Sequence, residues 1–265
     1  MVAQLRERAG RGPELPTGIE SLDAITQGVW KRQLTVIAGR PGDGKTSLAL
    51  QIAGALADRR KAVVFVSYEM TREELVTRLF ASHTRQNLRD VGMMIAQGPE
   101  LDRRLEAFRT AMQGQALQIV DDLPRDWKHL KEFLELLDPV PDAVFIDHLQ
   151  EVSTVGFRSS WDAYTEYVAA MKWLAKKLRI AVILCSQLSR PDKGEDEGKR
   201  PQLRDLKGTG AIEEKADTVV LLWPTKDRRT GEWQPTLKLL VEKQRHGPTG
   251  ACDVLFNREH YVFAG

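Results

Sequence analysis

The nine residues GRPGDGKTS, from Gly39 to Ser47, have the types and spacing that hold a triphosphate. They fit the pattern G-x-x-x-x-G-K-[ST], and they lie between an apolar run at 34–38 and a helical pattern that begins at Lys45. Glycines in such a loop let backbone N–H groups turn inward, and the helix N-terminus adds partial positive charge. The alternative is a glycine-rich turn with a solvent-facing lysine, which the strand–loop–helix context disfavours. The predicted nucleotide-binding residues are Gly39, Arg40, Pro41, Gly42, Asp43, Gly44, Lys45, Thr46 and Ser47.

Within this loop, Lys45 is expected to reach the β- and γ-phosphates of a nucleoside triphosphate, and the hydroxyl of Thr46 to bind Mg²⁺. Asp147 ends the apolar run AVFID. An acidic residue at the carboxyl end of a parallel strand lies where such sheets bind ligands, so Asp147 is expected to support the metal through water. The alternative is a solvent-exposed aspartate at the end of a strand.

Two further side chains follow predicted strands and suit hydrolysis. Glu69 lies just past the run AVVFVS, where its carboxylate can deprotonate an attacking water. The alternative is a charge that complements the dipole of a helix over 72–82, but Thr71 and Glu74 already form a capping box there. Gln187 follows the run AVILCS, and its amide can bind the γ-phosphate and sense hydrolysis. Its alternative is a polar loop residue.

The elements that position these side chains alternate between strand and helix. The strand-like runs are 34–38, 62–67, 117–121, 143–147, 181–186 and 218–222, and helical spacing covers Lys45–Asp58 and Trp161–Leu178. Short runs rich in Val and Ile without polar alternation predict strands buried on both faces of a mainly parallel sheet. We therefore expect an α/β fold of three layers with a P-loop and right-handed crossovers.

The last fifth of the chain changes this rhythm. Strand-like segments at 236–241, 252–256 and 261–263 have no room for helices between them, which predicts antiparallel hairpins that extend the sheet. The charged, Gly- and Pro-rich stretch 190–207 predicts a mobile loop. We expect residues 15–265 to form one domain, preceded by a tail or short linker helix at 1–14.

Composition excludes several classes of protein. The 265 residues include 42% hydrophobic and 29% charged residues, which is typical of globular proteins. The two cysteines, Cys185 and Cys252, both lie in predicted strands, which excludes a disulfide framework or a cysteine-ligated metal and predicts a reducing cytoplasm. No apolar run is long enough to span a membrane, so no membrane partner is expected. The net charge of +2 does not favour coating of nucleic acid by bulk charge.

Taken in order, the motifs resemble the ATPase domain of DnaB-type replicative helicases, in the RecA-like superfamily. The resemblance runs from about Leu15 to the C-terminus. The segments that carry it are LPTGIESLDAITQGVWKRQLTVIAGRPGDGKTSLALQIA, SYEM, FIDHLQ, SQLSR, KGTGAIEEKAD and VEKQRHGPTG.

The resemblance implies a motor that binds ATP and Mg²⁺ and translocates on single-stranded DNA as a homo-oligomeric ring, expected to be a hexamer, with 5′→3′ polarity. It implies that Glu69 activates water, that Gln187 senses the γ-phosphate, and that Lys243 and Arg245 reach the nucleotide of a neighbouring subunit. Without the resemblance, the K-x-R pair reads as the solvated face of an edge strand. The usual N-terminal helical domain does not precede the match, so coupling to a primase or a helicase loader is an open expectation.

Two segments are predicted to contact DNA in such a ring. The first is 151–163, with Arg158 available for phosphate. The second ends in KGTGAI, where Lys207, Gly208, Thr209 and Gly210 suit contacts with the DNA backbone because glycine allows close approach. The alternative for the glycines is a helix N-terminal turn capped by Thr209, and both roles can coexist.

Two other functions compete with a helicase. One is a recombination ATPase of the RecA/RadA type, which forms filaments; the segments that carry Lys243 and KGTGAI favour the helicase. The other is a nucleotide-dependent scaffold or loader without motor activity. Glu69 argues against this second alternative, because a protein that only binds nucleotide needs no base.

Overall fold

The computed structural model describes residues 14–85, 103, 106–108, 116–189, 198–207, 210–226, 230 and 232–265. Residues 1–13 of the predicted tail at 1–14, and residues 190–197 of the stretch 190–207 that was predicted as a loop, lie outside them. The strands are β1 (Leu34–Gly39), β2 (Val63–Ser67), β3 (Leu117–Val120), β4 (Ala143–Asp147), β5 (Ala181–Gln187), β6 (Thr218–Lys226), β7 (Trp233–Gln244), β8 (Gly250–Asn257) and β9 (Val262–Ala264).

These strands form one nine-stranded sheet in the order β3-β2-β4-β5-β1-β6-β7-β8-β9. Neighbours from β3 to β6 in this order pair in parallel. The last three pairings, from β6 to β9, are antiparallel. The predicted parallel sheet with antiparallel C-terminal strands is therefore confirmed.

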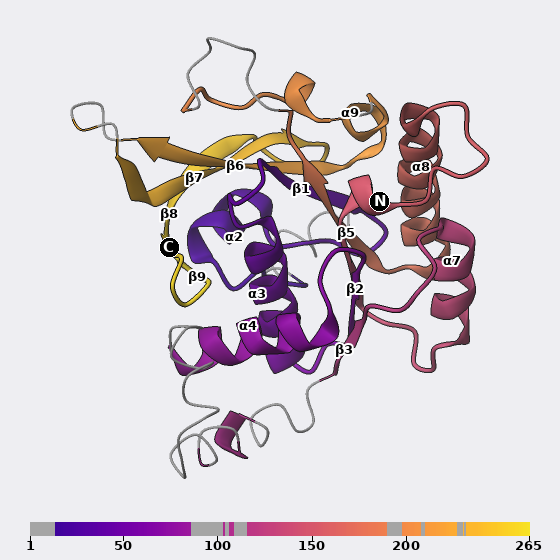
Figure 1. The fold of residues 1–265 in the computed structure, drawn as a ribbon, viewed down its shortest axis with the longest axis horizontal. Coiled ribbons are helices and arrows are strands. Elements are labelled where there is room, and N and C mark those ends of the chain that lie inside the picture. Colours follow the sequence, from indigo (N-terminus) through magenta and orange to yellow (C-terminus); the bar gives the residue numbers. More distant parts are fainter. Residues whose placement is uncertain are drawn as a thin grey trace, which may run out of the picture.

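Helices cover both faces of the sheet (Figure 1). The helices are α2 (Glu20–Thr26), α3 (Lys45–Asp58), α4 (Arg72–Thr84), α7 (Trp127–Leu136), α8 (Ser160–Leu178) and α9 (Ala211–Lys215), with short 3₁₀ turns η1 (Leu149–Glu151) and η2 (Leu203–Asp205). Buried side chains of α2, α3 and α4 join one hydrophobic cluster with the C-terminal strands, and those of α7, α8 and α9 join a second. The predicted three layers are confirmed.

Strand β2 shows how the sequence builds this arrangement. Val63 and Phe65 belong to the first cluster, whereas Val64 and Val66 belong to the second. Successive side chains of a strand point to opposite faces, so a strand covered on both faces needs an unbroken apolar run. All five residues of β2 are buried, as that pattern predicted.

Local signals set the ends of several helices. Thr71 and Glu74 form the predicted capping box at the start of α4. At the start of α7 the side chain of Asp126 accepts hydrogen bonds from the backbone N–H groups of Lys128 and His129. The prediction of a loop as far as residue 207 was wrong at its C-terminal end. There η2 forms and Leu206 is buried against the second cluster, where it bridges Leu188.

Candidate nucleotide site

The residues with predicted chemistry gather at the carboxyl edge of the parallel strands. The last residues of neighbouring strands lie side by side, with Gly39 of β1 opposite Gln187 of β5 and Ser67 of β2 opposite Asp147 of β4. The segments that leave these strands surround a cavity of about 400 Å³. It is lined by Pro41, Gly42, Gly44, Lys45, Thr46, Ser47, Glu69, Met70, Arg78, Gln187, Phe256, Arg258 and Tyr261.

The phosphate loop has the backbone conformation that its glycines predicted. Gly42 and Gly44 have positive φ angles of 84° and 100°. Gly44 is the N-cap of α3, and no side chain caps this helix. The first N–H groups of α3 therefore remain available to an anion. Lys45 is buried, and its Nζ atom lies 3.2 Å from the carbonyl oxygen of Arg40.

Asp43 stabilises the turn of this loop from within. Its Oδ2 atom accepts a hydrogen bond of 2.6 Å from the backbone N–H of Arg40. Burial raises the pKa of Asp43 from 3.8 to about 6, although this hydrogen bond and the charge of Lys45 lower it. The carboxyl group of Asp43 therefore changes its charge near pH 6.

Asp147 is fully buried and faces the phosphate loop. Its Oδ2 atom accepts a hydrogen bond of 2.7 Å from the hydroxyl of Thr46, whereas its Oδ1 atom is buried with no hydrogen-bond partner. Burial raises the pKa of Asp147, and the hydrogen bond from Thr46 lowers it. A carboxylate beside a hydroxyl offers the oxygen ligands that Mg²⁺ prefers, so the two residues fit the predicted metal.

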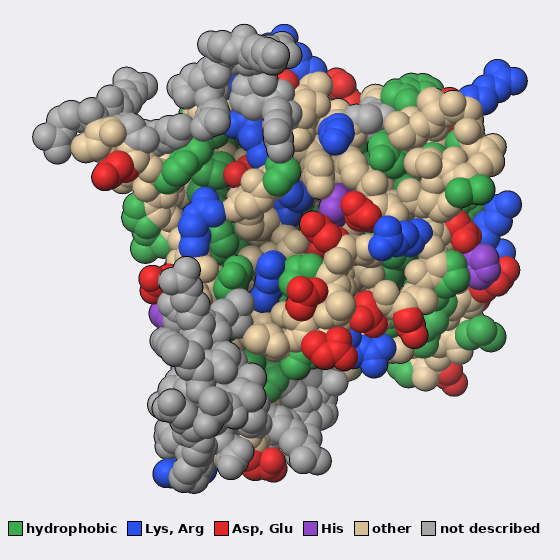
Figure 2. Space-filling view, viewed as in Figure 1, with side chains coloured by type: hydrophobic (Ala, Val, Ile, Leu, Met, Phe, Trp, Pro, Cys, Tyr) green, Lys and Arg blue, Asp and Glu red, His purple; other side chains and the backbone are tan. Residues whose placement is uncertain are grey.

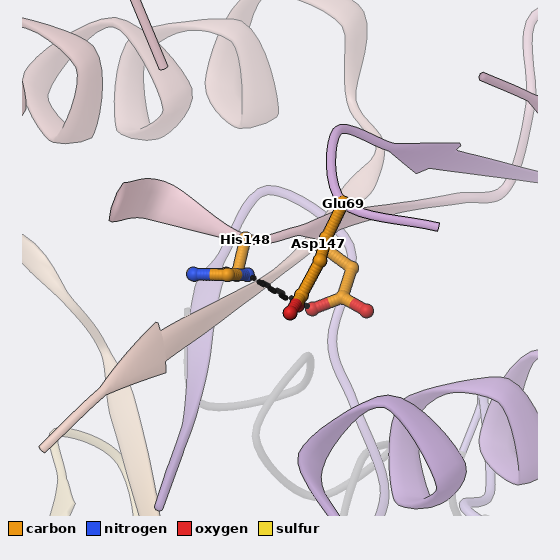
Figure 3. Close-up of side chains that lie close together, drawn as sticks. All are labelled: Glu69, Asp147 and His148. Atoms are coloured by element: carbon orange, nitrogen blue, oxygen red, sulfur yellow. Dashed lines mark ion pairs between the residues drawn. The ribbon is translucent and has the colours of Figure 1, made fainter. Parts of the chain in front are cut away.

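Glu69 approaches the same point from the loop after β2. Figure 3 shows the side chains of Glu69, Asp147 and His148 converging. The side chain of Glu69 is 54% exposed, whereas that of His148 is 1% exposed. The Oε2 atom of Glu69 lies 3.0 Å from Nδ1 of His148. An exposed carboxylate at the rim of the cavity can contact a water molecule that lies beside a bound phosphate.

Gln187 is held by two residues that the sequence analysis did not assign. Its side-chain Nε2 atom lies 2.7 Å from Nε2 of His148, and its backbone N–H donates to Oε1 of Gln150. The Nε2 atom of Gln150 donates to the hydroxyl of Ser186 and to the carbonyl oxygen of Lys207. Both residues belong to the motif FIDHLQ, of which only Asp147 was interpreted.

The C-terminal strands supply a second wall of the cavity, which the sequence analysis also missed. Phe256 and Phe263 stack with ring centroids 4.2 Å apart. Arg258 donates from Nη1 to the carbonyl oxygen of Gly42 at 2.7 Å, and its guanidinium lies 5.2 Å from the centroid of Phe256. These residues lie more than 200 positions from the phosphate loop, so no local pattern links them to it.

Arg78 of α4 and Tyr261 complete this wall. The guanidinium carbon of Arg78 lies 4.9 Å from the centroid of the Tyr261 ring. Arginine and aromatic side chains together suit a ligand that combines phosphates with a flat ring.

Lys243 and Arg245 do not join this cavity. They lie where β7 reaches the start of β6, with Lys243 opposite Val219, and thus at the amino edge of the sheet. Lys243 donates from Nζ to the carbonyl oxygen of Glu213 at 2.5 Å, and Arg245 donates to that of Glu214. Burial lowers the pKa of Lys243, and the charge of Arg245 lowers it further. Both side chains point to one side, as their spacing predicted.

The predicted DNA-contacting residues follow neighbouring strands. Arg158 is exposed between η1 and α8, after β4. Lys207 is also exposed, and its backbone N–H donates to the carbonyl oxygen of Gln187 at 3.0 Å. Gly210 is the N-cap of α9, and Gly208 and Thr209 lie outside the described residues.

The face drawn in Figure 2 shows no large patch of side chains with the same charge among the described residues. Lys and Arg side chains alternate there with Asp and Glu among the residues described. Among those residues, none of the helices combines the length and the apolar character that crossing a bilayer requires.

Comparison with known proteins places the whole described chain in one group. Residues 14–265 match the family described as the DnaB-like helicase C-terminal domain. The replicative DNA helicase DnaB of Geobacillus stearothermophilus is 29% identical over 99% of this chain. That of Leifsonia xyli is 33% identical over 98% of it. The chain spans 59% and 57% of the length of these relatives, respectively.

Solved structures agree with the sequence relatives. A DnaB-like replicative helicase, whose structure was described with its interactions with primase, has a TM-score of 0.88, at 26% identity over 99% of this chain and 64% of that chain. A second solved structure, described as an ATPase domain, also has a TM-score of 0.88, at 25% identity, with 99% of this chain and 95% of that chain covered. The predicted RecA-like fold is therefore confirmed.

Proposed function

Because the chain belongs to the DnaB-like helicase C-terminal domain family, we propose that it is an ATP-hydrolysing motor that moves along single-stranded DNA and unwinds duplexes during replication. The observation that carries this proposal is the convergence of phosphate loop, Glu69 and Gln187 around one cavity, with Asp147 beside Thr46. A protein that only binds nucleotide does not need an exposed carboxylate at the rim of the cavity that holds the phosphates.

The phosphate loop binds the substrate, ATP. The N–H groups at the start of α3 and the ammonium of Lys45 lie where they can neutralise the β- and γ-phosphates. Thr46 and Asp147 would hold Mg²⁺, which supplies charge neutralisation of the phosphates when bound. Arg258 and Tyr261 give the cavity a cationic and aromatic side for the rest of the nucleotide.

Glu69 then acts as the general base. Its carboxylate takes a proton from a water molecule while the water oxygen bonds to the γ-phosphorus. The bond from that phosphorus to the bridging oxygen breaks, which yields ADP and inorganic phosphate. Gln187 lines the same cavity, so its amide can contact the γ-phosphate before hydrolysis and lose that contact afterwards.

The position of Lys243 and Arg245 supports a ring of subunits. Both lie at the edge of the sheet opposite their own phosphate loop, so they cannot complete the site of the chain that carries them. In a homo-oligomer, here proposed to be a hexameric ring, they reach the nucleotide of the neighbour. An arginine supplied in this way contributes a factor of about 10³–10⁵ in the rate of phosphoryl transfer.

Single-stranded DNA is the proposed track. Arg158 and Lys207, with Gly208, Thr209 and Gly210, offer contacts with the phosphate backbone, which carry no sequence information and suit a motor that moves over any sequence. Primase is a proposed partner, because one structural neighbour is described with its interactions with primase, and a helicase loader is proposed as a further partner. The chain is proposed to work in the cytoplasm, because both of its cysteines are free thiols, as in a reducing compartment.

Purified protein with forked DNA tests the proposal. We expect ATP hydrolysis that single-stranded DNA stimulates. We also expect unwinding of a forked duplex that depends on its 5′ single-stranded tail. Lys45→Ala is the inactive control. Electron microscopy of the same sample distinguishes closed rings from the filaments that a recombination ATPase forms. ATP binding without hydrolysis, with or without DNA, would instead favour a scaffold or loader.

A further inference from the structure

His148 lies between the two residues that the proposed reaction depends on after ATP binds. Its imidazole ring is buried, with Nδ1 3.0 Å from Oε2 of Glu69 and Nε2 2.7 Å from the amide nitrogen of Gln187. Among the described residues, these are the contacts that join the predicted base to the predicted phosphate sensor. The proposed function does not yet use this side chain.

The hydrogen atoms of these groups determine the state of the ring. The amide nitrogen of Gln187 is a donor only, so Nε2 of His148 must accept with its lone pair. In the neutral ring the hydrogen then resides on Nδ1, which faces the carboxylate of Glu69. The ring therefore accepts on one side and has a donor to offer on the other.

The contact with Glu69 is close but incomplete. Although Nδ1 lies 3.0 Å from Oε2, the pair lacks hydrogen-bond alignment, and Nδ1 is a buried atom without a hydrogen-bond partner. A buried donor without an acceptor is unfavourable, because it has given up its hydrogen bond to water. The side chain of Glu69 is 54% exposed. A rotation of this side chain would align its carboxylate with Nδ1–H of His148 and complete the hydrogen bond.

We propose that His148 is a positioning residue that restrains Glu69 until Gln187 engages the γ-phosphate. While the amide of Gln187 donates to Nε2, it polarises the ring and strengthens Nδ1–H as a donor to Glu69. When the amide turns to the phosphate, Nε2 loses its donor and the hold on Glu69 weakens. The carboxylate is then free to accept a proton from water.

The backbone around the ring keeps it in place for this role. Gln150 fixes the backbone N–H of Gln187, and the backbone N–H of Tyr68, next to Glu69, donates to the carbonyl oxygen of Asp147 at 2.7 Å. The side chains of Glu69 and Gln187 can therefore move while their backbones stay in register with His148.

A metal site is the competing interpretation of the same residues. One ligand atom from each of Glu69, Asp147 and His148 lies within 4.8 Å of the others. A metal would need the lone pair of Nδ1, however, and the hydrogen bond from Gln187 to Nε2 places the hydrogen of the neutral ring on Nδ1. The contacts therefore favour a relay between side chains.

The tautomer of His148 gives a test that does not depend on catalysis. In protein with ¹⁵N-labelled histidine, the signal of His148 is identified among the five histidines by its loss in His148→Asn. We expect the hydrogen on Nδ1 in the wild type, and a shift toward the Nε2–H form in Gln187→Ala. An Nε2–H ring in the wild type would overturn the relay. A change of this signal with Zn²⁺ alone would assign a metal site instead.

Two substitutions of His148 separate positioning from a structural role. In His148→Asn the side-chain amide can replace Nδ1–H but cannot reach Gln187, so Glu69 stays restrained. In His148→Gln the longer amide can reach Gln187 but leaves Glu69 unrestrained. We expect kcat for ATP without DNA to fall about fivefold in the first and rise about fivefold in the second, the equivalent of one hydrogen bond of about 1 kcal/mol. KM for ATP should change little in either.

A purely structural role predicts that both variants lower kcat and thermal stability together, and that result would contradict the proposal. The proposal rests on the proposed function, but the two fail differently. A wild-type protein without ATP hydrolysis contradicts the function, whereas the tautomer is measured in the resting protein. Opposite changes of kcat in the two variants support both.

Discussion

At the scale of single residues, the cavity separates the groups that bind a triphosphate from the group that activates water. Lys45 and the first N–H groups of α3 lie on one side, and Glu69 enters from the loop after β2. Binding and turnover should therefore respond to different substitutions.

Glu69→Gln tests this separation. The amide keeps the size of the side chain but cannot accept a proton from water, so we expect kcat to fall about 10²–10⁴-fold with ATP affinity nearly unchanged. Lys45→Ala should weaken both affinity and turnover. Equilibrium binding of a fluorescent ATP analogue, measured beside single-turnover hydrolysis, distinguishes the two. Hydrolysis by Glu69→Gln at the wild-type rate would show that another group is the base.

Asp43 predicts a pH dependence of nucleotide binding. Its pKa of about 6 in the folded protein means that it becomes negative within the phosphate loop as the pH rises from 5 to 7. We expect ATP affinity to fall by up to about tenfold across this window, the effect of one pKa unit of coupling. Asp43→Asn retains an oxygen that can accept from the backbone N–H of Arg40, and its affinity should be flat over the same window.

The same group affects stability with a defined sign. The pKa of Asp43 lies above its unfolded value of 3.8, so the folded state binds the proton more tightly. The free energy of unfolding should therefore fall as the pH rises from about 4 to about 6. Denaturant unfolding of Asp43→Asn provides the comparison. An equally steep fall in that variant would assign the pH dependence to other groups.

At the scale of elements, the phosphate loop is fitted against the C-terminal strands. A Cβ atom on Gly44 would lie 2.8 Å from Phe256 and 3.0 Å from Phe263, whose rings are buried and stacked. A Cβ atom on Gly42 would meet nothing within 4 Å. Both glycines have positive φ angles, so the two positions differ mainly in the space around them.

Gly42→Ala and Gly44→Ala therefore form a matched pair. In Gly42→Ala the free energy of unfolding should fall by about 1 kcal/mol, the cost of a strained φ angle. In Gly44→Ala it should fall by about 1–3 kcal/mol more, because the stacked rings cannot move aside. Chemical denaturation of both variants measures the difference. Equal losses would mean that the aromatic wall yields to the loop.

The elements also show how far sequence reasoning reaches. Strands β1, β2, β4 and β5 were predictable because burial on both faces requires an unbroken apolar run, and the phosphate loop because its spacing is strict. Helix α7 was missed, although Asp126 caps it. The approach of Arg258 to Gly42 could not be predicted, since the tertiary fold rather than the local sequence brings these distant residues together. His148 was visible in FIDHLQ, but its function depends on neighbours from two other strands.

At the scale of the whole molecule, the edge that carries Arg245 lies opposite the edge that carries the phosphate loop. If Arg245 acts in trans as proposed, each chain carries two incomplete halves of a site. Association of chains side by side would join them.

Mixing of variants tests whether Arg245 acts in trans. Arg245→Ala lacks the arginine that is proposed to reach the neighbouring nucleotide, and Lys45→Ala lacks the ammonium that binds the phosphates. Each variant alone should therefore hydrolyse ATP poorly. In mixed rings, a Lys45→Ala subunit can lend its Arg245 to an intact phosphate loop, and part of the ATPase activity without DNA should return. The double variant Lys45→Ala/Arg245→Ala lacks this arginine and should restore nothing. If mixed rings form, as pull-down of differently tagged subunits would show, and activity never exceeds the sum of the two variants, a role in cis or in structure is favoured.

Lys207→Ala tests the proposed DNA contact. A contact with phosphate alone should weaken binding about equally for all sequences and reduce the slope of log K against log salt by about one. Lys176 is also exposed but lies near the end of α8, which leads into the start of β5, so Lys176→Ala is the matched control. Fluorescence anisotropy over a series of salt concentrations measures both. An unchanged slope for Lys207→Ala would shift the proposed DNA path toward Arg158.

Gln150 connects the cavity with the proposed DNA contact, beside the direct hydrogen bond from the backbone N–H of Lys207 to the carbonyl oxygen of Gln187. Its amide bonds the backbone of Gln187, whose residue lines the cavity, and that of Lys207, which is proposed to face DNA. Thermodynamic linkage then imposes reciprocity: the factor by which bound DNA tightens ATP binding must equal the factor by which ATP tightens DNA binding. Such couplings amount to about 1–3 kcal/mol, so loss of the γ-phosphate would loosen the grip on the strand by the same factor, about 5- to 150-fold. ATP hydrolysis and release of DNA would thus be governed by the same coupling free energy.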